Sequence, residues 1–203
     1  AMSRTFAQFL SILLHPVLMP TYAIWFLFHH SSYFSYTVSP PERDALYMIV
    51  LLNTLVLPTI VSYILIRRGW IRSFEMEKRE ERVIPFLTNA ALLLIAYYLM
   101  RKLMLPQVFP LLILGAAVAV TFAAIINFKW KISIHMIGIG GIIGTFFGLS
   151  TFLLVDVRIP ILFCLLVAGL LGTARLSLGA HTPMQIYAGF LVGFLCEFLL
   201  LSI

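Results

Sequence analysis

Acidic residues are scarce in this chain of 203 residues, which has eight Asp and Glu against 14 Lys and Arg. The eight are Glu42, Asp44, Glu75, Glu77, Glu80, Glu81, Asp156 and Glu197. None of them forms the carboxylate pairs or triplets that hold magnesium in enzymes of phosphoryl or prenyl transfer. The sequence therefore argues against a metal-dependent enzyme, and we expect neither a metal site nor a cofactor.

Cysteine is almost absent, since the chain has only Cys164 and Cys196. Both lie inside apolar runs, without the spacing of a metal site and without a pairing partner nearby in the sequence. We interpret both as buried packing residues that say nothing about the redox compartment.

Long polar segments are absent as well. The longest polar stretches are residues 31–43 and 67–82, and neither can form an extramembrane domain. With 62% hydrophobic residues, 11% charged residues and a mean hydropathy of +1.04, the composition is that of an integral membrane protein. Residues 1–203 are therefore expected to form a single membrane domain, with the function in the bundle or at its rim.

The chain instead has a series of apolar runs, each long enough for a helix of roughly 20 residues to cross the hydrocarbon layer. They lie near residues 6–28, 45–66, 84–100, 108–127, 132–155, 159–175 and 183–203. Unbroken runs of this length argue against a β-barrel, whose strands are short and alternate in polarity. The sequence predicts an all-α polytopic transmembrane bundle of six or seven spans, because Pro16 and Pro20 can kink the first run or leave it partly interfacial.

Basic residues are unevenly distributed over the loops. When successive loops are assigned to alternate sides of the membrane, one face receives Arg4, Arg67, Arg68, Arg72, Lys78, Arg79, Arg82, Lys129, Lys131 and Arg175, and the other receives Arg43, Arg101, Lys102 and Arg158. The positive-inside rule would place the richer face in the cytoplasm. Cations that bind a substrate are placed by that task on either side, however, so the sequence leaves the sidedness open.

Three basic clusters fall on the richer face, with an even number of spans between each cluster and the next. They are residues 77–82 followed by Pro85, residues 131–135 and residues 175–185. Converging cations suit a phosphate monoester or a pyrophosphate, because they stabilise the charge on its equatorial oxygens in the transition state. His135 and His181 add a nucleophile that can carry the phosphoryl group and a general acid that can protonate the leaving group.

Three short patterns in these clusters keep a characteristic spacing. Ala174-Arg175 is followed after five residues by His181 and after three more by Gln185; Ile132-Ser133-Ile134-His135 precedes it, and Lys78, Arg79, Arg82 and Pro85 come earlier still. In this order they resemble the motifs of the type 2 phosphatidic acid phosphatase superfamily. The members of this superfamily are metal-independent phosphatases of membrane lipids. Those motifs read Lys, six residues, Arg-Pro; then Pro-Ser-Gly-His; then Ser-Arg, five residues, His, three residues, Asp.

The resemblance implies a phosphatase-like core at about residues 75–193 and a role for each matching residue. His181 would be the nucleophile, His135 the general acid and Gln185 the residue that orients the nucleophile. The phosphate ligands would be Arg175, Ser133, Lys78, Arg79 and Arg82, to which Lys131 is added because it lies near His135 in the sequence.

The reaction implied by the resemblance is hydrolysis of a lipid phosphate monoester or a polyprenyl diphosphate through a phosphohistidine. The expected partner is a phosphorylated membrane lipid, such as phosphatidate or phosphatidylglycerophosphate, and no nucleic acid. The expected location is a bacterial cytoplasmic membrane.

Two positions depart from the family pattern. Gln185 stands where the family has an Asp that supports the cationic form of the histidine, and Gln can accept the same hydrogen bond but brings no charge. Ala174 replaces a serine whose hydroxyl would bind phosphate, a role that Ser177 or Thr182 could fill. Both differences favour an alternative, in which the protein is catalytically weak or inactive and binds lipid phosphates without hydrolysis.

Other features have simpler interpretations. His15 is expected to be a packing or interfacial residue, and the charges at residues 75–82 could form a salt-bridged turn on the membrane surface. Glycines after His135 and in the last run predict close helix contact rather than a phosphate loop; they are Gly138, Gly140, Gly141, Gly144, Gly189 and Gly193. A transporter is disfavoured, because the halves of the chain do not resemble each other and Glu197, near the chain end, is not expected to be a buried coupling carboxylate.

Overall fold

A computed structural model describes residues 2–30, 32–74, 76, 78–153 and 156–202. Over these residues the chain is helical, and seven helical segments are long and apolar enough to cross a membrane. They are Arg4–His29, Pro40–Arg67, Glu80–Lys102, Val108–Asn127, Ile134–Thr151, Arg158–Ser177 and Pro183–Leu201. The predicted polytopic helical bundle is confirmed, with seven candidate spans. Glu77 of the first basic cluster and Glu75, two residues before it, lie outside the described residues.

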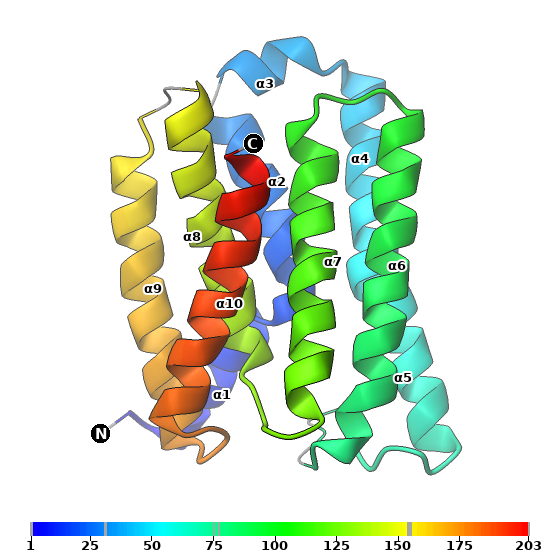
Figure 1. Ribbon diagram of the computed structural model, residues 1–203, viewed down its shortest axis with the longest axis vertical. Coiled ribbons are helices and arrows are strands. Elements are labelled where there is room, and N and C mark those ends of the chain that lie inside the picture. The colour runs from blue at the N-terminus through cyan, green and yellow to red at the C-terminus, as the bar shows by residue number, and fades with distance from the viewer. Residues whose placement is uncertain (1, 31, 75, 77, 154–155, 203) are drawn as a thin grey trace.

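The spans run alternately up and down in Figure 1. In chain order the elements are α1 (Arg4–Leu13), η1 (Pro16–Leu18), α2 (Met19–His30), α3 (Ser32–Thr37), α4 (Pro40–Leu51), η2 (Leu52–Val56), α5 (Leu57–Arg67), η3 (Glu80–Arg82), α6 (Val83–Lys102), α7 (Val108–Asn127), α8 (Ile134–Leu153), α9 (Arg158–Ser177) and α10 (Pro183–Leu201). The loops before α6, α8 and α10 all lie at the bottom of that view, which we call the lower end. The three basic clusters therefore share one end, as the even number of intervening spans predicts.

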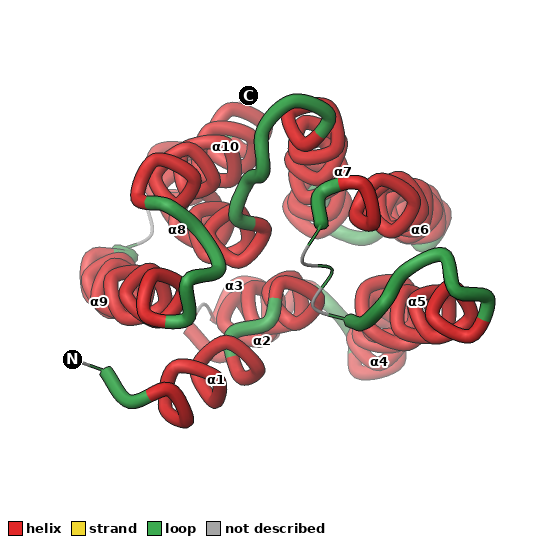
Figure 2. The backbone as a smooth tube through the Cα atoms, turned by 90° about the horizontal axis from the view of Figure 1, so that it is seen from below, coloured by secondary structure: helices red, strands yellow, loops and turns green. Residues whose placement is uncertain are grey.

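The first span is broken where His15 precedes Pro16. Proline has no backbone N–H to continue an α-helix, and the chain passes through the 3-10 turn η1 before it resumes as α2. The helix before this break, α1, packs against α9 at the lower end, as the view along the helices shows (Figure 2). The kink expected from the proline is confirmed.

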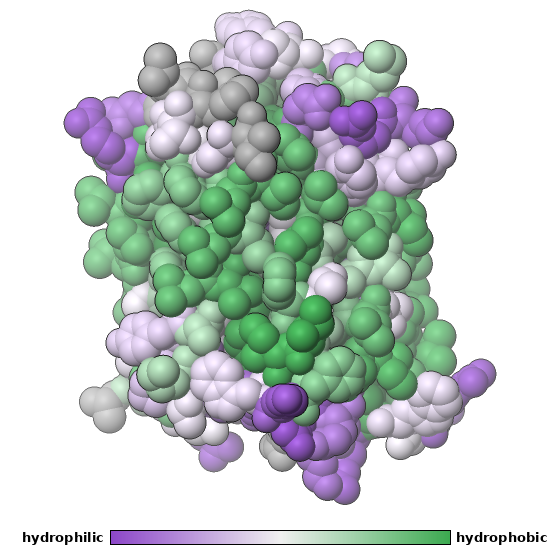
Figure 3. All heavy atoms as spheres, in the orientation of Figure 1, coloured by the Kyte–Doolittle hydropathy of each residue, from purple (hydrophilic) through white to green (hydrophobic). Residues whose placement is uncertain are grey.

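The surface has the zones that a bilayer requires. An apolar band covers the middle of the molecule, and hydrophilic side chains gather at both ends (Figure 3). Large apolar side chains such as Phe163 and Leu166 of α9 are mostly exposed within this band. Such exposure would be costly in water and is favourable against lipid.

The most extensive contact between helices joins α8 and α10, and glycine makes the close approach possible. A Cβ added at Gly144 of α8 would overlap the carbonyl oxygen of Phe194, and one added at Gly193 of α10 would overlap that of Ile137. The predicted small-residue face is therefore confirmed. Because α8 begins next to His135 and α10 begins next to His181, this packing also sets how the two histidines lie relative to each other.

Candidate active site

A cavity of about 1000 Å³ begins among the lower-end loops and extends into the bundle. Along α8 it is lined from His135 to Thr145, ten residues apart, which corresponds to about 15 Å of depth at the helical rise of 1.5 Å per residue. The chemically active side chains that line its lower part are Arg4, Ser11, His15, Arg82, Lys131, His135, Arg175 and His181. The cavity thus brings together residues from all three basic clusters and from the first span.

His181 precedes α10 and is held by a residue one turn further along. Gln185 Oε1 accepts the backbone N–H of Thr182 at 3.2 Å and contacts His181 Nδ1 at 3.1 Å. An amide oxygen can only accept, so Nδ1 carries the ring proton and donates it. The other ring nitrogen, Nε2, therefore has a free lone pair when the ring is neutral.

The surroundings of His181 keep that ring neutral. Its side chain is only 8% exposed, and its pKa lies at about 3 instead of 6.5, chiefly because of burial. The charges of Arg82, Arg175 and Lys131 lower the pKa further, and the hydrogen bond to Gln185 opposes them. At neutral pH the site therefore contains an uncharged imidazole beside three cations.

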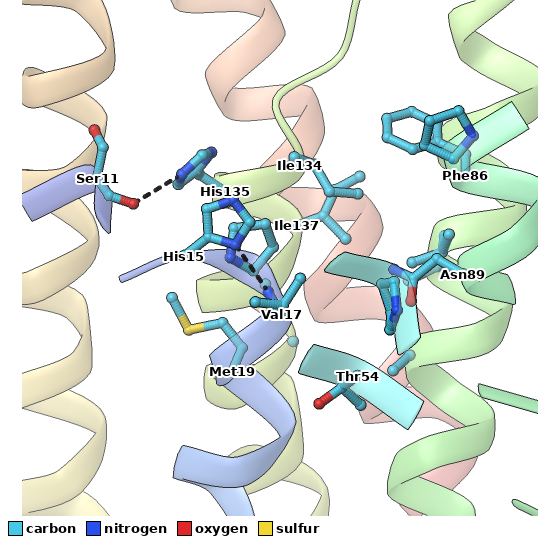
Figure 4. A pocket seen from close by; sticks show the side chains of 18 of the residues that line it. Ser11, His15, Val17, Met19, Thr54, Phe86, Asn89, Ile134, His135 and Ile137 are labelled. Carbon is cyan, nitrogen blue, oxygen red and sulfur yellow. Dashed lines mark hydrogen bonds between the residues drawn. The ribbon is translucent and has the colours of Figure 1, made fainter. Parts of the chain in front are cut away.

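His135 lies in the first turn of α8 and is buried. Its Nε2 lies 3.1 Å from the backbone oxygen of Ser11, which can only accept, so Nε2 carries a proton and donates it (Figure 4). The ring of His15 meets the ring of His135 edge to face, with centroids 5.3 Å apart. A protonated nitrogen at this position can serve a leaving group only where that group's oxygen replaces Ser11 as the acceptor.

Arg175 stands in the last turn of α9, where a cation also interacts favourably with the helix dipole. Its Nη1 donates to Ser11 Oγ at 3.1 Å. Ala174, next to it, is fully buried and packs with Ala7 and Leu10 of α1 in a small separate apolar cluster. The hydroxyl beside Arg175 thus comes from Ser11, and the predicted substitutes Ser177 and Thr182 do not line the cavity.

Arg82 and Lys131 complete the cationic wall. Arg82 is 6% exposed; its Nε donates to the oxygen of Met76 at 2.8 Å and its Nη1 to that of Ile132 at 3.4 Å. It therefore ties the loop before α6 to the start of α8 as well as lining the cavity. Lys131 is half-buried and lines the same region.

Three of the residues predicted as phosphate ligands lie elsewhere. Lys78 is exposed and does not line the cavity. Arg79 is held at the surface, where Nη1 donates to the oxygen of Lys129 at 2.9 Å and Nε pairs with Glu80 at 2.8 Å. Ser133 is fully buried and does not line the cavity, and its backbone N–H donates to the oxygen of Gln185 at 3.4 Å. The salt-bridged surface interpretation thus fits Arg79, whereas Arg82 points inward.

Three cavity residues that sequence reasoning missed are in the first span. Ser11 and Arg4 line the cavity, and His15, interpreted from the sequence as a packing or interfacial residue, lines it too. The available signal was a histidine next to a proline inside an apolar run, because intramembrane polar residues are commonly functional. The contacts of Ser11 with His135 and Arg175 depend on how α1 packs against α9, which no local sequence pattern reveals.

Glu197 corrects another expectation. It is 4% exposed and lines the deep part of the cavity, although the sequence suggested no buried carboxylate. Among the described residues, no group of three or more His, Cys, Asp and Glu side chains is arranged to hold a metal ion. The lower part of the cavity therefore offers cations, imidazoles and a hydroxyl, and the deep part offers a single carboxyl group.

Comparisons of the chain with protein-family models, with curated proteins and with solved structures gave no match.

Proposed function

We propose that this protein is a metal-independent phosphatase of a membrane lipid, acting through a phosphohistidine. The observation that carries the proposal is the state of His181, a neutral imidazole whose Nδ1 proton is fixed by Gln185 and whose Nε2 lone pair is left to react. Arg82, Lys131 and Arg175 line the same cavity and supply positive charge for the phosphate oxygens.

The reaction takes place in two steps. His181 Nε2 attacks phosphorus and the bond from phosphorus to the leaving oxygen of the lipid, or of the lipid phosphate in a diphosphate, breaks. That oxygen keeps the electron pair and takes a proton from the imidazolium form of His135, which is left as a neutral imidazole. Water then attacks the phosphohistidine, His135 accepts a proton from this water, and the bond from phosphorus to His181 breaks to release inorganic phosphate. Neutral His181 suits the first step, because only an unprotonated nitrogen is nucleophilic.

The substrate in this proposal is a lipid phosphate monoester or a polyprenyl diphosphate in a bacterial cytoplasmic membrane; phosphatidate and phosphatidylglycerophosphate are examples. A cavity that begins at the charged lower end and continues into the apolar bundle suits such a ligand, because the phosphate and the lipid part need opposite surroundings.

A second candidate function is binding of lipid phosphates without hydrolysis. The observation in its favour is Gln185, whose neutral amide holds Nδ1 but does not stabilise the positive charge that the ring acquires in phosphohistidine formation. A carboxylate there would do both.

The test is phosphate release from a panel of lipid phosphates and diphosphates by purified protein in detergent, without divalent metal. We expect His181→Ala to abolish release and Gln185→Asp to increase it by about tenfold or more, because the carboxylate supplies the missing charge. His29→Ala is the matched control, since His29 lies at the opposite end of the bundle and stacks on Trp25. No release from any substrate, even with Gln185→Asp, would exclude the phosphatase and leave the binding protein.

A further inference from the structure

Glu197 occupies a prepared position deep in the cavity. Its carboxyl group lies against Gly115 of α7 and its side chain against Gly141 of α8, and a Cβ added at Gly115 would overlap the carboxyl oxygens. Two neighbouring helices therefore lack a side chain at the places where the carboxyl group needs room. Burying such a group in an apolar bundle is costly unless it has a partner.

Three buried polar atoms of residues in this part of the molecule have no hydrogen-bond partner among the described residues. They are Glu197 Oε2, Asn89 Oδ1 and Thr54 Oγ1, from α10, α6 and the π-helical turn η2. All three residues line the cavity. Figure 4 shows Asn89 and Thr54 on the side opposite His15 and His135. Native proteins pair nearly all buried polar atoms, so three unpaired oxygens around one cavity point to a ligand that donates hydrogen bonds.

The position of these oxygens relative to the histidines limits what the ligand can be. Gly141, which contacts Glu197, lies six residues beyond His135 on α8, or about 9 Å deeper at the helical rise. Apolar residues such as Leu93, Val120 and Ile142 line the cavity at these levels. The oxygens therefore face the hydrophobic part of a lipid whose phosphate lies at the histidines, and a plain hydrocarbon chain would leave them unpaired.

We propose that the deep part of the cavity is a second binding subsite, in which Glu197, Asn89 and Thr54 bind a hydroxyl or amino group carried by the lipid part of the ligand. The subsite selects lipids with a hydrogen-bond donor close to the phosphate over lipids whose only polar groups near it are esters. The position of the phosphate in this inference rests on the proposed function, whereas the recognition of the donor group does not.

The test uses lipids without phosphate, so that it is independent of catalysis. Binding of a long-chain amino alcohol, a chain-matched alcohol and a chain-matched hydrocarbon to detergent-solubilised protein is measured by calorimetry. We expect the amino alcohol to bind at least about tenfold more tightly than the hydrocarbon, the range of one or two hydrogen bonds to a carboxyl group. Glu197→Leu should remove this preference.

A milder variant and a control keep the result interpretable if Glu197→Leu fails to fold. Glu197→Gln retains the shape and an acceptor oxygen, so it should keep the preference for the hydroxyl group and lose any added preference for the amine. Thr173→Val is the control, because Thr173 is exposed on α9 and its hydroxyl bonds only within its own helix. Equal affinities for all three lipids, or a donor preference that survives both Glu197 variants, would overturn the subsite and indicate that water satisfies these oxygens.

The outcome is separable from that of the proposed function. Donor preference in binding, with no phosphate release from any substrate of the panel even with Gln185→Asp, would support the subsite and exclude the phosphatase. Phosphate release together with equal affinities for donor-bearing and donor-free lipids would support the phosphatase and exclude the subsite.

Discussion

Gln185 determines which nitrogen of His181 can react. Because its Oε1 is already an acceptor for the backbone of Thr182, the amide is fixed in one orientation and the His181 proton stays on Nδ1. An Asp at the same position is one methylene shorter than Gln and adds a negative charge. This charge should appear in the pH dependence of the reaction.

We expect the kcat/KM of phosphate release to persist as the pH falls through 6.5, the usual histidine pKa, because His181 has a pKa of about 3 and stays neutral. Gln185→Asp places a negative charge beside the ring, which stabilises the imidazolium and raises its pKa. Protonation removes the nucleophile, so the acid limb of the Gln185→Asp profile should lie at higher pH than that of the wild type.

The measurement is kcat/KM against pH for both proteins with one substrate. Ionisation of the substrate is common to both profiles, so the displacement between them reports on His181. Acid limbs that coincide would contradict the assignment of His181 as the group that must be neutral.

At the scale of elements, the α8–α10 contact sets how His135 and His181 lie relative to each other. His135 lies in the first turn of α8 and Gln185 in the first turn of α10, and the N–H of Ser133 donates to the oxygen of Gln185 across the pair. A change in the distance between these helices would move the proposed general acid relative to the proposed nucleophile.

Gly193→Ala should therefore lower both stability and activity. The added methyl group would overlap the carbonyl oxygen of Ile137, and overpacking of this kind costs about 1–3 kcal/mol. Thermal unfolding in detergent, followed by helical circular dichroism, measures the loss as a lower Tm.

Gly169→Ala is the matched control for that variant. Gly169 lies in α9, and a Cβ added there would meet no neighbouring atom. Alanine should therefore leave the Tm unchanged or raise it slightly through its better helix propensity. Equal Tm values for Gly193→Ala and the wild type would show that α8 and α10 can move apart without cost.

At the scale of the whole molecule, seven spans place the start of α1 and the end of α10 at opposite ends of the bundle (Figure 1). Most of the Lys and Arg residues lie at the lower end with the cavity mouth. The positive-inside rule then predicts that the lower end faces the cytoplasm.

Cysteine labelling in intact cells with a membrane-impermeant reagent tests this topology. In a background with Cys164→Ala and Cys196→Ala, we expect Thr37→Cys, at the upper end, to react from outside, and Ser73→Cys and Ser177→Cys, at the lower end, to react only after the cells are opened. Reaction of Ser73→Cys and Thr37→Cys from the same side would contradict seven spans, and reversed labelling would contradict only the assignment of sides.

The sequence by itself determined the features that depend on local composition. Apolar runs close to the length of a membrane span predicted the helices. The even number of spans between the three basic clusters predicted that the clusters share one end. The spacing of the glycines predicted the close helix pair. Lys131, His135, Arg175 and His181 were singled out in the same way, since cations and imidazoles beside apolar runs are conspicuous wherever the chain later folds.

Only the tertiary structure decided which of these side chains meet around a cavity. Arg79 and Arg82 are three residues apart and chemically alike, yet one pairs with Glu80 at the surface and the other lines the cavity. Ser11 reaches His135 because the break at Pro16 lets α1 pack against α9, and Glu197 lines the cavity because glycines on two other helices leave it room. Orientation and burial depend on contacts between segments far apart in the chain, and such contacts are set by packing rather than by local pattern.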